Sequence, residues 1–191
     1  MKQYLSLYIH IPFCKSRCAY CNFTTFAGKD DLISAYVGAL CREIQLRSAD
    51  FINYKIETIY IGGGTPSYID PNLIKKIMDC AKRCFCVEKG AEVTIECNPN
   101  SVDEEKLRIY LSAGINRFSL GIQSFSNKTL KRVGRPQDSK TVFDALAAFK
   151  KNKINNFGVD FIMGLPHQTL SGFRKYIETI LLKKPAHFSC Y

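Results

Sequence analysis

Short runs of apolar residues alternate with longer stretches of mixed polarity along the chain of 191 residues. The short runs are rich in β-branched residues and end near glycine or proline, which predicts strands. We place these strands at 5–11, 57–63, 92–97, 117–123, 157–163 and 187–191. The stretches between them predict helices near 30–50, 71–86, 103–113, 139–152 and 170–183. Alternation of strand and helix predicts parallel βαβ units with right-handed crossovers.

The polarity of alternate strand positions distinguishes an open doubly wound sheet from a barrel. In the strand 117–123, Phe118, Leu120 and Ile122 share one face, and small or polar residues occupy the other. A comparable polar face recurs in at least three other strands. A parallel sheet with helices on both faces would be apolar on both, so this face is expected to border a wet or ligand-filled space. The pattern predicts a partial (β/α) barrel, and because the chain stops within its sixth strand we expect a truncated barrel, the fragment of a longer protein.

The amino-acid composition limits which binding partners and which cellular compartment are expected. With 46% hydrophobic residues the chain can bury a core, and a single domain is expected. The net charge of +10 is scattered along the expected helices without a nucleic-acid-binding motif, so no specific nucleic acid is expected. No run predicts a signal peptide or an integral membrane protein. Nine cysteines without a secretory signal favour reduced thiols and a cytoplasmic location.

Three cysteines stand close together on a short polar loop after the first strand. Cys14, Cys18 and Cys21 form the pattern C-x3-C-x2-C. Thiolates at this spacing suit an iron–sulfur cluster or zinc. A [4Fe–4S] cluster held by three cysteines would keep one iron open, whereas structural zinc would need a fourth ligand such as His10. Buried thiols without a metal are the third interpretation.

The cysteine motif and several further segments resemble the radical S-adenosylmethionine (SAM) family. These segments are "YIHIPFCKSRCAYCNF", "GGGTPSYI", "IECNP", "GIQSF", "VGRPQD" and "DFIMGLP". Together they resemble the coproporphyrinogen III dehydrogenase-like subgroup, which also contains heme chaperones. The resemblance implies a partial (β/α)6 barrel of the radical SAM type, with residues 1–191 forming the core domain and a C-terminal domain absent from this chain. It implies a [4Fe–4S] cluster on the three cysteines, SAM as a second cofactor, and reductive cleavage of SAM as the chemistry.

The run "GGGTP" closes a strand with glycines and leads into a helix. Glycine permits a close backbone approach, and a helix N-terminus favours anionic groups. A ligand or an ordinary tight turn would each account for this pattern. The resemblance implies that Gly63, Gly64 and Thr65 line the methionyl end of SAM.

Polar residues at strand ends supply further candidates for binding SAM. Glu96 ends its strand on the polar face and needs a partner for its charge, either the α-amino group of SAM or a salt bridge with Arg117. Gln123 and Asp160 lie at the same level of neighbouring strands, where the ribose hydroxyls would bind.

Two other residues, Arg135 and Tyr8, have a binding interpretation and an ordinary one. Arg135 could clamp the carboxylate of SAM in a bidentate pair or be a surface residue. Tyr8 could pack near the cluster or the nucleoside, or fill the barrel. Tyr20, between the last two cysteines, is a cofactor-binding candidate by resemblance. In contrast, Cys80 and Cys84 are expected to be buried small hydrophobes on an outer helix.

Two departures from the dehydrogenase pattern indicate the branch of the subgroup. The dehydrogenase has a further cysteine two residues after the third, where this chain has Phe23. It also has an N-terminal extension before its first strand. We therefore expect a protein that binds heme and delivers it to heme-accepting proteins. The alternatives are an oxygen-independent coproporphyrinogen III dehydrogenase and a zinc-stabilised binding protein without SAM.

Overall fold

A single parallel sheet of six strands forms the centre of the computed structural model, which describes residues 3–191. The strands are β1 (Gln3–Ile11), β4 (Tyr54–Gly63), β5 (Cys86–Cys97), β6 (Arg117–Gln123), β7 (Phe157–Phe161) and β8 (His187–Cys190). They lie in the order β1-β4-β5-β6-β7-β8, so each strand pairs with the next one along the chain. Successive right-handed βα units produce this order. The expected partial barrel is confirmed.

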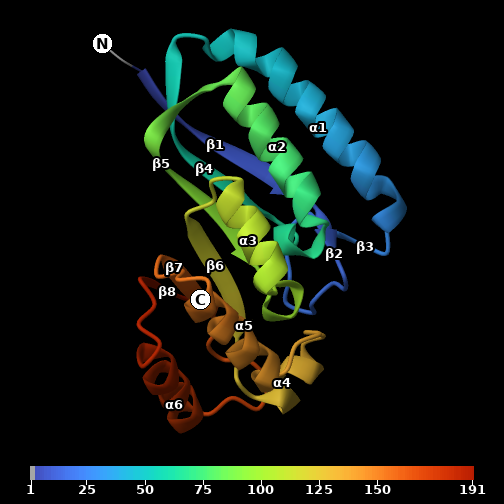
Figure 1. The fold of residues 1–191 in the computed structure, drawn as a ribbon. Coiled ribbons are helices and arrows are strands. Elements are labelled where there is room, and N and C mark those ends of the chain that lie inside the picture. Colours follow the sequence, from blue (N-terminus) through green and yellow to red (C-terminus); the bar gives the residue numbers. More distant parts are fainter. Residues whose placement is uncertain (1–2) are drawn as a thin grey trace.

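Helices cover one face of this curved sheet (Figure 1). They are α1 (Ile33–Ser48), α2 (Pro71–Cys84), α3 (Glu104–Ser112), α4 (Asn127–Arg132), α5 (Ser139–Lys151) and α6 (Leu170–Leu181). Most begin at a side-chain cap, which accepts a hydrogen bond from a free backbone N–H of the first turn. These caps are Asp70, Asp103, Ser126, Asp138 and Thr169.

The hydrophobic core lies between the sheet and the helices. Phe118, Leu120 and Ile122 of β6 are fully buried in it. Along β1, in contrast, the residues that alternate with the core positions are exposed, including Ser6 and Tyr8. Within the described residues 3–191, the polar face therefore carries no helix and borders open space (Figure 1), as the alternation predicts. Among residues 3–191, no helix is long and apolar enough to cross a bilayer.

Several element boundaries differ from the sequence predictions. β4 begins at Tyr54 and β5 at Cys86, both earlier than predicted. The expected helix 71–86 ends at Cys84 because the chain turns at Phe85 into extended backbone. The helix α4 was not predicted, since six residues carry too little helical periodicity. Two very short strands, β2 (Phe13–Cys14) and β3 (Phe26–Ala27), pair in parallel and bracket the cysteine loop.

Candidate functional site

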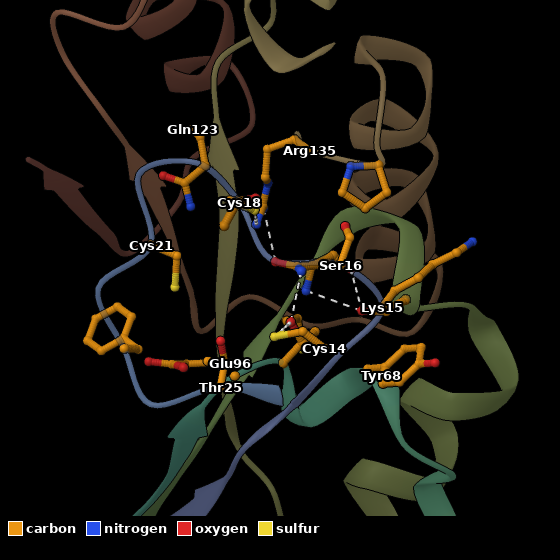
Figure 2. Close-up of a pocket in the computed structure, with 18 of the residues that line it drawn as sticks. Cys14, Lys15, Ser16, Cys18, Cys21, Thr25, Tyr68, Glu96, Gln123 and Arg135 are labelled. Atoms are coloured by element: carbon orange, nitrogen blue, oxygen red, sulfur yellow. Dashed lines mark hydrogen bonds between the residues drawn. The ribbon is translucent and has the colours of Figure 1, made fainter. Parts of the chain in front are cut away.

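A cavity of about 580 Å³ lies at the carboxyl ends of the strands. Its lining includes the end of β4 at Gly63, of β5 at Glu96 and of β6 at Gln123, together with Asp160 of β7. The loop that carries the three cysteines borders the same cavity (Figure 2). A volume of this size is typical of small-molecule and cofactor sites.

The three thiols of the cysteine loop all line the cavity. Cys14 is buried, whereas Cys18 and Cys21 are partly exposed. Burial is the main cause that raises the pKa of the Cys14 thiol, and a hydrogen bond with Thr65 partly opposes it. Among residues 3–191, no three His, Cys, Asp or Glu side chains converge on a point where one metal ion would bind. A four-iron cluster offers each thiolate an iron of its own, so its ligands need not converge on one point.

The cysteine loop is attached to the turn that follows α4. The backbone N–H of Ala19 donates to the carbonyl of Val133 over 3.0 Å, and the Ser16 hydroxyl donates to the carbonyl of Gly134. Gly134 has a φ of 72°, in the left-handed region that favours glycine. The turn thus places Arg135 beside the loop, with Nη1 4.0 Å from Sγ of Cys18.

The glycine run packs tightly against the start of the cysteine loop. A Cβ on Gly64 would lie 2.8 Å from the carbonyl oxygen of Phe13, and one on Gly63 would lie 2.7 Å from the His10 ring. Gly63 also has a φ of 117°. Packing within the protein therefore accounts for these glycines without a ligand. In the same run, the Thr65 hydroxyl lies 3.4 Å from Sγ of Cys14.

Glu96 lies at the cavity with hydrogen-bond donors and makes no salt bridge within residues 3–191. Its carboxylate accepts from the Tyr60 hydroxyl over 2.7 Å and from the backbone N–H of Gly63 over 3.1 Å. The expected alternative partner, Arg117, pairs with Glu92 instead. Burial raises the pKa of Glu96 above its ordinary value, because desolvation outweighs the two hydrogen bonds.

Gln123 and Asp160 face the cavity from neighbouring strands. Gln123 has a φ of 65°, which is unusual for a residue other than glycine, and its buried Oε1 has no protein partner. Asp160 accepts a hydrogen bond from the Ser119 hydroxyl over 2.9 Å. A strained residue that carries an unpaired polar atom into a cavity is consistent with a ligand-binding role.

Arg135 is a partly buried cavity residue, so its interpretation as a surface residue is wrong. Its Nη2 donates to Oδ1 of Asn98 over 3.0 Å and to the carbonyl of Gly121, while Nε is buried without a partner. Tyr20 also lines the cavity, and its buried hydroxyl lies beside the Cys18 thiol. Thr25 has a buried hydroxyl without a partner at the same cavity. These unpaired atoms fit a polar cofactor such as SAM.

Tyr8 is not among the residues that line this cavity. Its side chain is 57% exposed, its ring stacks on Tyr60, and its hydroxyl donates to Nδ1 of His10 over 2.9 Å. The other ring nitrogen of His10 must then carry the proton, and it donates to the carbonyl of Thr24 over 3.0 Å. Both ring nitrogens of His10 are thus engaged within the protein.

Sequence reasoning did not single out Asn98, although it stands in the quoted segment "IECNP". Asn98 lines the cavity and hydrogen-bonds both Thr65 and Arg135. The sequence feature that could have identified Asn98 is its position directly after a predicted strand whose last residues include the polar-face residue Glu96. The two outer-helix thiols behave differently: Cys80 is buried and donates to the carbonyl of Cys41, while Cys84 is partly exposed.

The fold and the cavity together define a radical SAM type of barrel, and comparison with known proteins leads to the same class. The model of the radical SAM superfamily matches residues 8–180. The chain belongs to this superfamily, and membership implies a [4Fe–4S] cluster and SAM as cofactors.

Two curated relatives and one solved structure illustrate the similarity. The heme chaperone HemW of Buchnera aphidicola (from Acyrthosiphon pisum) is 36% identical over 188 residues, covering 98% of this chain and 50% of that protein. An oxygen-independent coproporphyrinogen III oxidase of Bradyrhizobium diazoefficiens is 34% identical over 189 residues, covering 97% and 42%. The structure of coproporphyrinogen III oxidase (HemN) from Escherichia coli superimposes with a TM-score of 0.89 at 29% identity, covering 98% and 44%. The chain spans about half the length of the curated relatives it matches.

Proposed function

We propose that residues 1–191 form the radical SAM core domain of a cytoplasmic heme chaperone, which binds heme and passes it to heme-accepting proteins. In this proposal Cys14, Cys18 and Cys21 hold one [4Fe–4S] cluster. The observation that carries it is the position of three thiols from one loop at the edge of a cavity with unpaired polar atoms. When both cofactors are bound, the chemistry they supply is transfer of one electron from the cluster to the sulfonium of SAM.

The protein's own residues would hold SAM by charge and by hydrogen bonds. Glu96 would accept from the α-amino group, because its partly buried carboxylate makes no salt bridge among the described residues. Arg135 would pair with the carboxylate through its free Nε. Gln123 and Asp160 would bind the ribose hydroxyls.

The remaining cavity positions would orient the methionyl group and exclude water. Gly63, Gly64 and Thr65 supply a backbone that approaches closely, and Tyr20 lines the same cavity with its hydroxyl beside Cys18. Tyr8 would act indirectly, by orienting His10 beneath Gly63.

The heme chaperone is favoured over a coproporphyrinogen III dehydrogenase by two observations. The relatives at 35–37% identity include several heme chaperones named HemW. In addition, Phe23 occupies the position where the dehydrogenase has a fourth cysteine, and its ring is exposed at the edge of the cavity. An exposed aromatic ring suits contact with a flat, apolar macrocycle.

Anaerobic reconstitution followed by heme titration tests the proposal. We expect four irons and four sulfides per chain, and loss of the cluster in Cys14→Ala, Cys18→Ala and Cys21→Ala. Cys86→Ala is the matched control, because Cys86 is exposed on β5 and should leave the cluster intact. Zinc without sulfide would support the zinc-stabilised alternative. A cluster without saturable heme absorbance in the complete protein would contradict the chaperone assignment.

A further inference from the structure

Asn98 makes hydrogen bonds in two directions from the loop after β5. Its Nδ2 lies 3.1 Å from Oγ1 of Thr65, and its Oδ1 lies 3.0 Å from Nη2 of Arg135. Each of these two partners, Thr65 and Arg135, also contacts a thiol of the cysteine loop. Thr65 Oγ1 lies 3.4 Å from Sγ of Cys14, and Arg135 Nη1 lies 4.0 Å from Sγ of Cys18.

The chemistry of these groups fixes the direction of every hydrogen bond. A guanidinium has only donors, so the amide atom that faces Arg135 must be the oxygen of Asn98. The amide nitrogen then faces Thr65, whose oxygen must accept because the NH2 group can only donate. The hydroxyl hydrogen of Thr65 is thereby left for Cys14, which can only accept once it is a thiolate.

The position of Asn98 is held by the backbone around it. Its N–H donates to Oγ of Ser67 over 3.1 Å and to Oγ of Ser101 over 3.3 Å, in a reciprocal capping arrangement. Lys106 of α3 donates to the carbonyl of Ser67 over 2.8 Å and so attaches this turn to the helix. A Cβ on Gly121 would lie 3.3 Å from Oδ1 of Asn98, so glycine leaves the space in which the amide meets the guanidinium.

We propose that Asn98 is a positioning residue that tunes the iron–sulfur cluster. Its amide directs the hydroxyl of Thr65 at Cys14. The same amide directs the guanidinium of Arg135 at Cys18. Hydrogen bonds to cluster sulfurs are one of the factors that set the reduction potential. Donors aimed at thiolates stabilise the more negative, reduced cluster, so this arrangement raises the potential and eases one-electron reduction by a low-potential reductant. The inference rests on the proposed cluster site.

The test is an anaerobic redox titration of the cluster-loaded chain with dithionite and mediator dyes, followed by electron paramagnetic resonance. Asn98→Ala should lower the ratio of reduced to oxidised cluster at a fixed potential about threefold to tenfold; a tenfold change corresponds to about 59 mV for one electron. Asn100→Ala is the matched control on the same loop, because its exposed side chain makes none of these contacts. It should titrate like the unchanged chain.

Variants of Thr65 test the route by which Asn98 acts. Thr65→Val removes the donor with little change in volume and should lower the ratio, whereas Thr65→Ser keeps a hydroxyl and should restore it. In the Thr65→Val background, Asn98→Ala should shift the ratio less than it does alone, because the two residues share one interaction.

Two failures are distinguishable. If the unchanged chain carries no [4Fe–4S] cluster, the proposed function is wrong. If it carries one, and Asn98→Ala and Thr65→Val both titrate at the unchanged potential, the positioning role is wrong. If Asn98→Ala fails to load a cluster, the reduction potentials of Thr65→Val and Thr65→Ser are compared instead. Equal potentials in these two variants would overturn the inference.

Discussion

The partly buried carboxylate of Glu96 illustrates how a binding residue can cost stability. Its pKa is raised above the ordinary value, chiefly by burial. A raised carboxyl pKa means that the folded state disfavours the charged form more than the unfolded chain does. The free energy of unfolding therefore decreases, and the chain becomes less stable, as pH rises from the ordinary glutamate pKa through the raised one.

Exchange of this carboxylate should separate stability from binding. We expect Glu96→Gln to raise the melting temperature of the cofactor-free chain at ~pH 7 and to change it little near ~pH 3, well below the ordinary glutamate pKa, where the wild-type carboxyl is protonated in both states. The same variant should weaken SAM binding about tenfold or more, because a hydrogen bond to a charged group contributes about 1.5–3 kcal/mol. Thermal melts at both pH values and calorimetric titration of cluster-loaded protein with SAM measure these effects.

Glu92→Gln is the control for that comparison. Glu92 lies on the same strand, β5, but is exposed and pairs with Arg117 away from the cavity. Its exchange should leave SAM affinity unchanged. Equal SAM affinity in Glu96→Gln and the unchanged chain would remove Glu96 from the site.

Gln123 stores backbone strain at the end of β6. Its φ of 65° is one that glycine adopts freely. We expect Gln123→Gly to leave the cofactor-free chain as stable or more stable, by up to about 1–2 kcal/mol, and to weaken SAM binding through loss of the amide. Lys153→Gly provides the control, since Lys153 has a φ of 57° and is not among the residues that line the cavity. Weakened SAM binding in both variants would show that the effect is not local.

At the scale of elements, the alternation of apolar and polar residues was sufficient to predict the six strands and the five long helices. It predicted the polar face as well, because a period of two is set by the strand itself. Boundaries were less accurate: β5 begins at Cys86, where the segment contains Lys89 and Gly90 and lacks a clear strand pattern.

The candidate site was predicted from strand position and from the family resemblance, and the cavity residue that sequence reasoning missed is Asn98, directly after β5. Strand position placed Glu96 and Gln123 on the polar face, whereas the resemblance assigned them to SAM, and that assignment stays a prediction. The contact of Arg135 with Cys18 joins segments more than one hundred positions apart, and no local pattern encodes it. Tyr8 shares the polar face with cavity residues, but it lies too early in β1 to reach the carboxyl ends of the strands.

The attachment of the cysteine loop to the turn after α4 leads to a prediction at this scale. Gly134→Ala should strain the turn because of its φ of 72°, at a cost of about 1–2 kcal/mol. Since Ser16 and Ala19 bond to this turn, we expect faster loss of iron to a chelator. Gly164→Ala is the matched control, with a φ of 76° and open space around it. If both variants release iron at the same rate, the turn does not stabilise the loop.

At the scale of the whole molecule, the sheet places its chemistry at one end and leaves the polar face uncovered. The described residues 3–191 include no helix on that face in Figure 1. A radical reaction on a large substrate needs an enclosed site, because water and side reactions must be excluded. Binding of heme depends instead on apolar contact, for which the exposed ring of Phe23 at the edge of the cavity is suited.

This difference leads to the prediction that separates the two heme-related functions. We expect the complete protein, loaded with cluster and supplied with SAM and a reductant, to bind heme and to form no protoporphyrinogen from coproporphyrinogen III under anaerobic conditions. The oxygen-independent oxidase of Bradyrhizobium diazoefficiens, assayed in parallel by chromatography of the products, is the positive control. Phe23→Ala should weaken heme binding without loss of the cluster, because Phe23 is not a ligand in the proposed site. Turnover of coproporphyrinogen III by the unchanged protein, without stable heme binding, would instead assign the chain to the dehydrogenase branch.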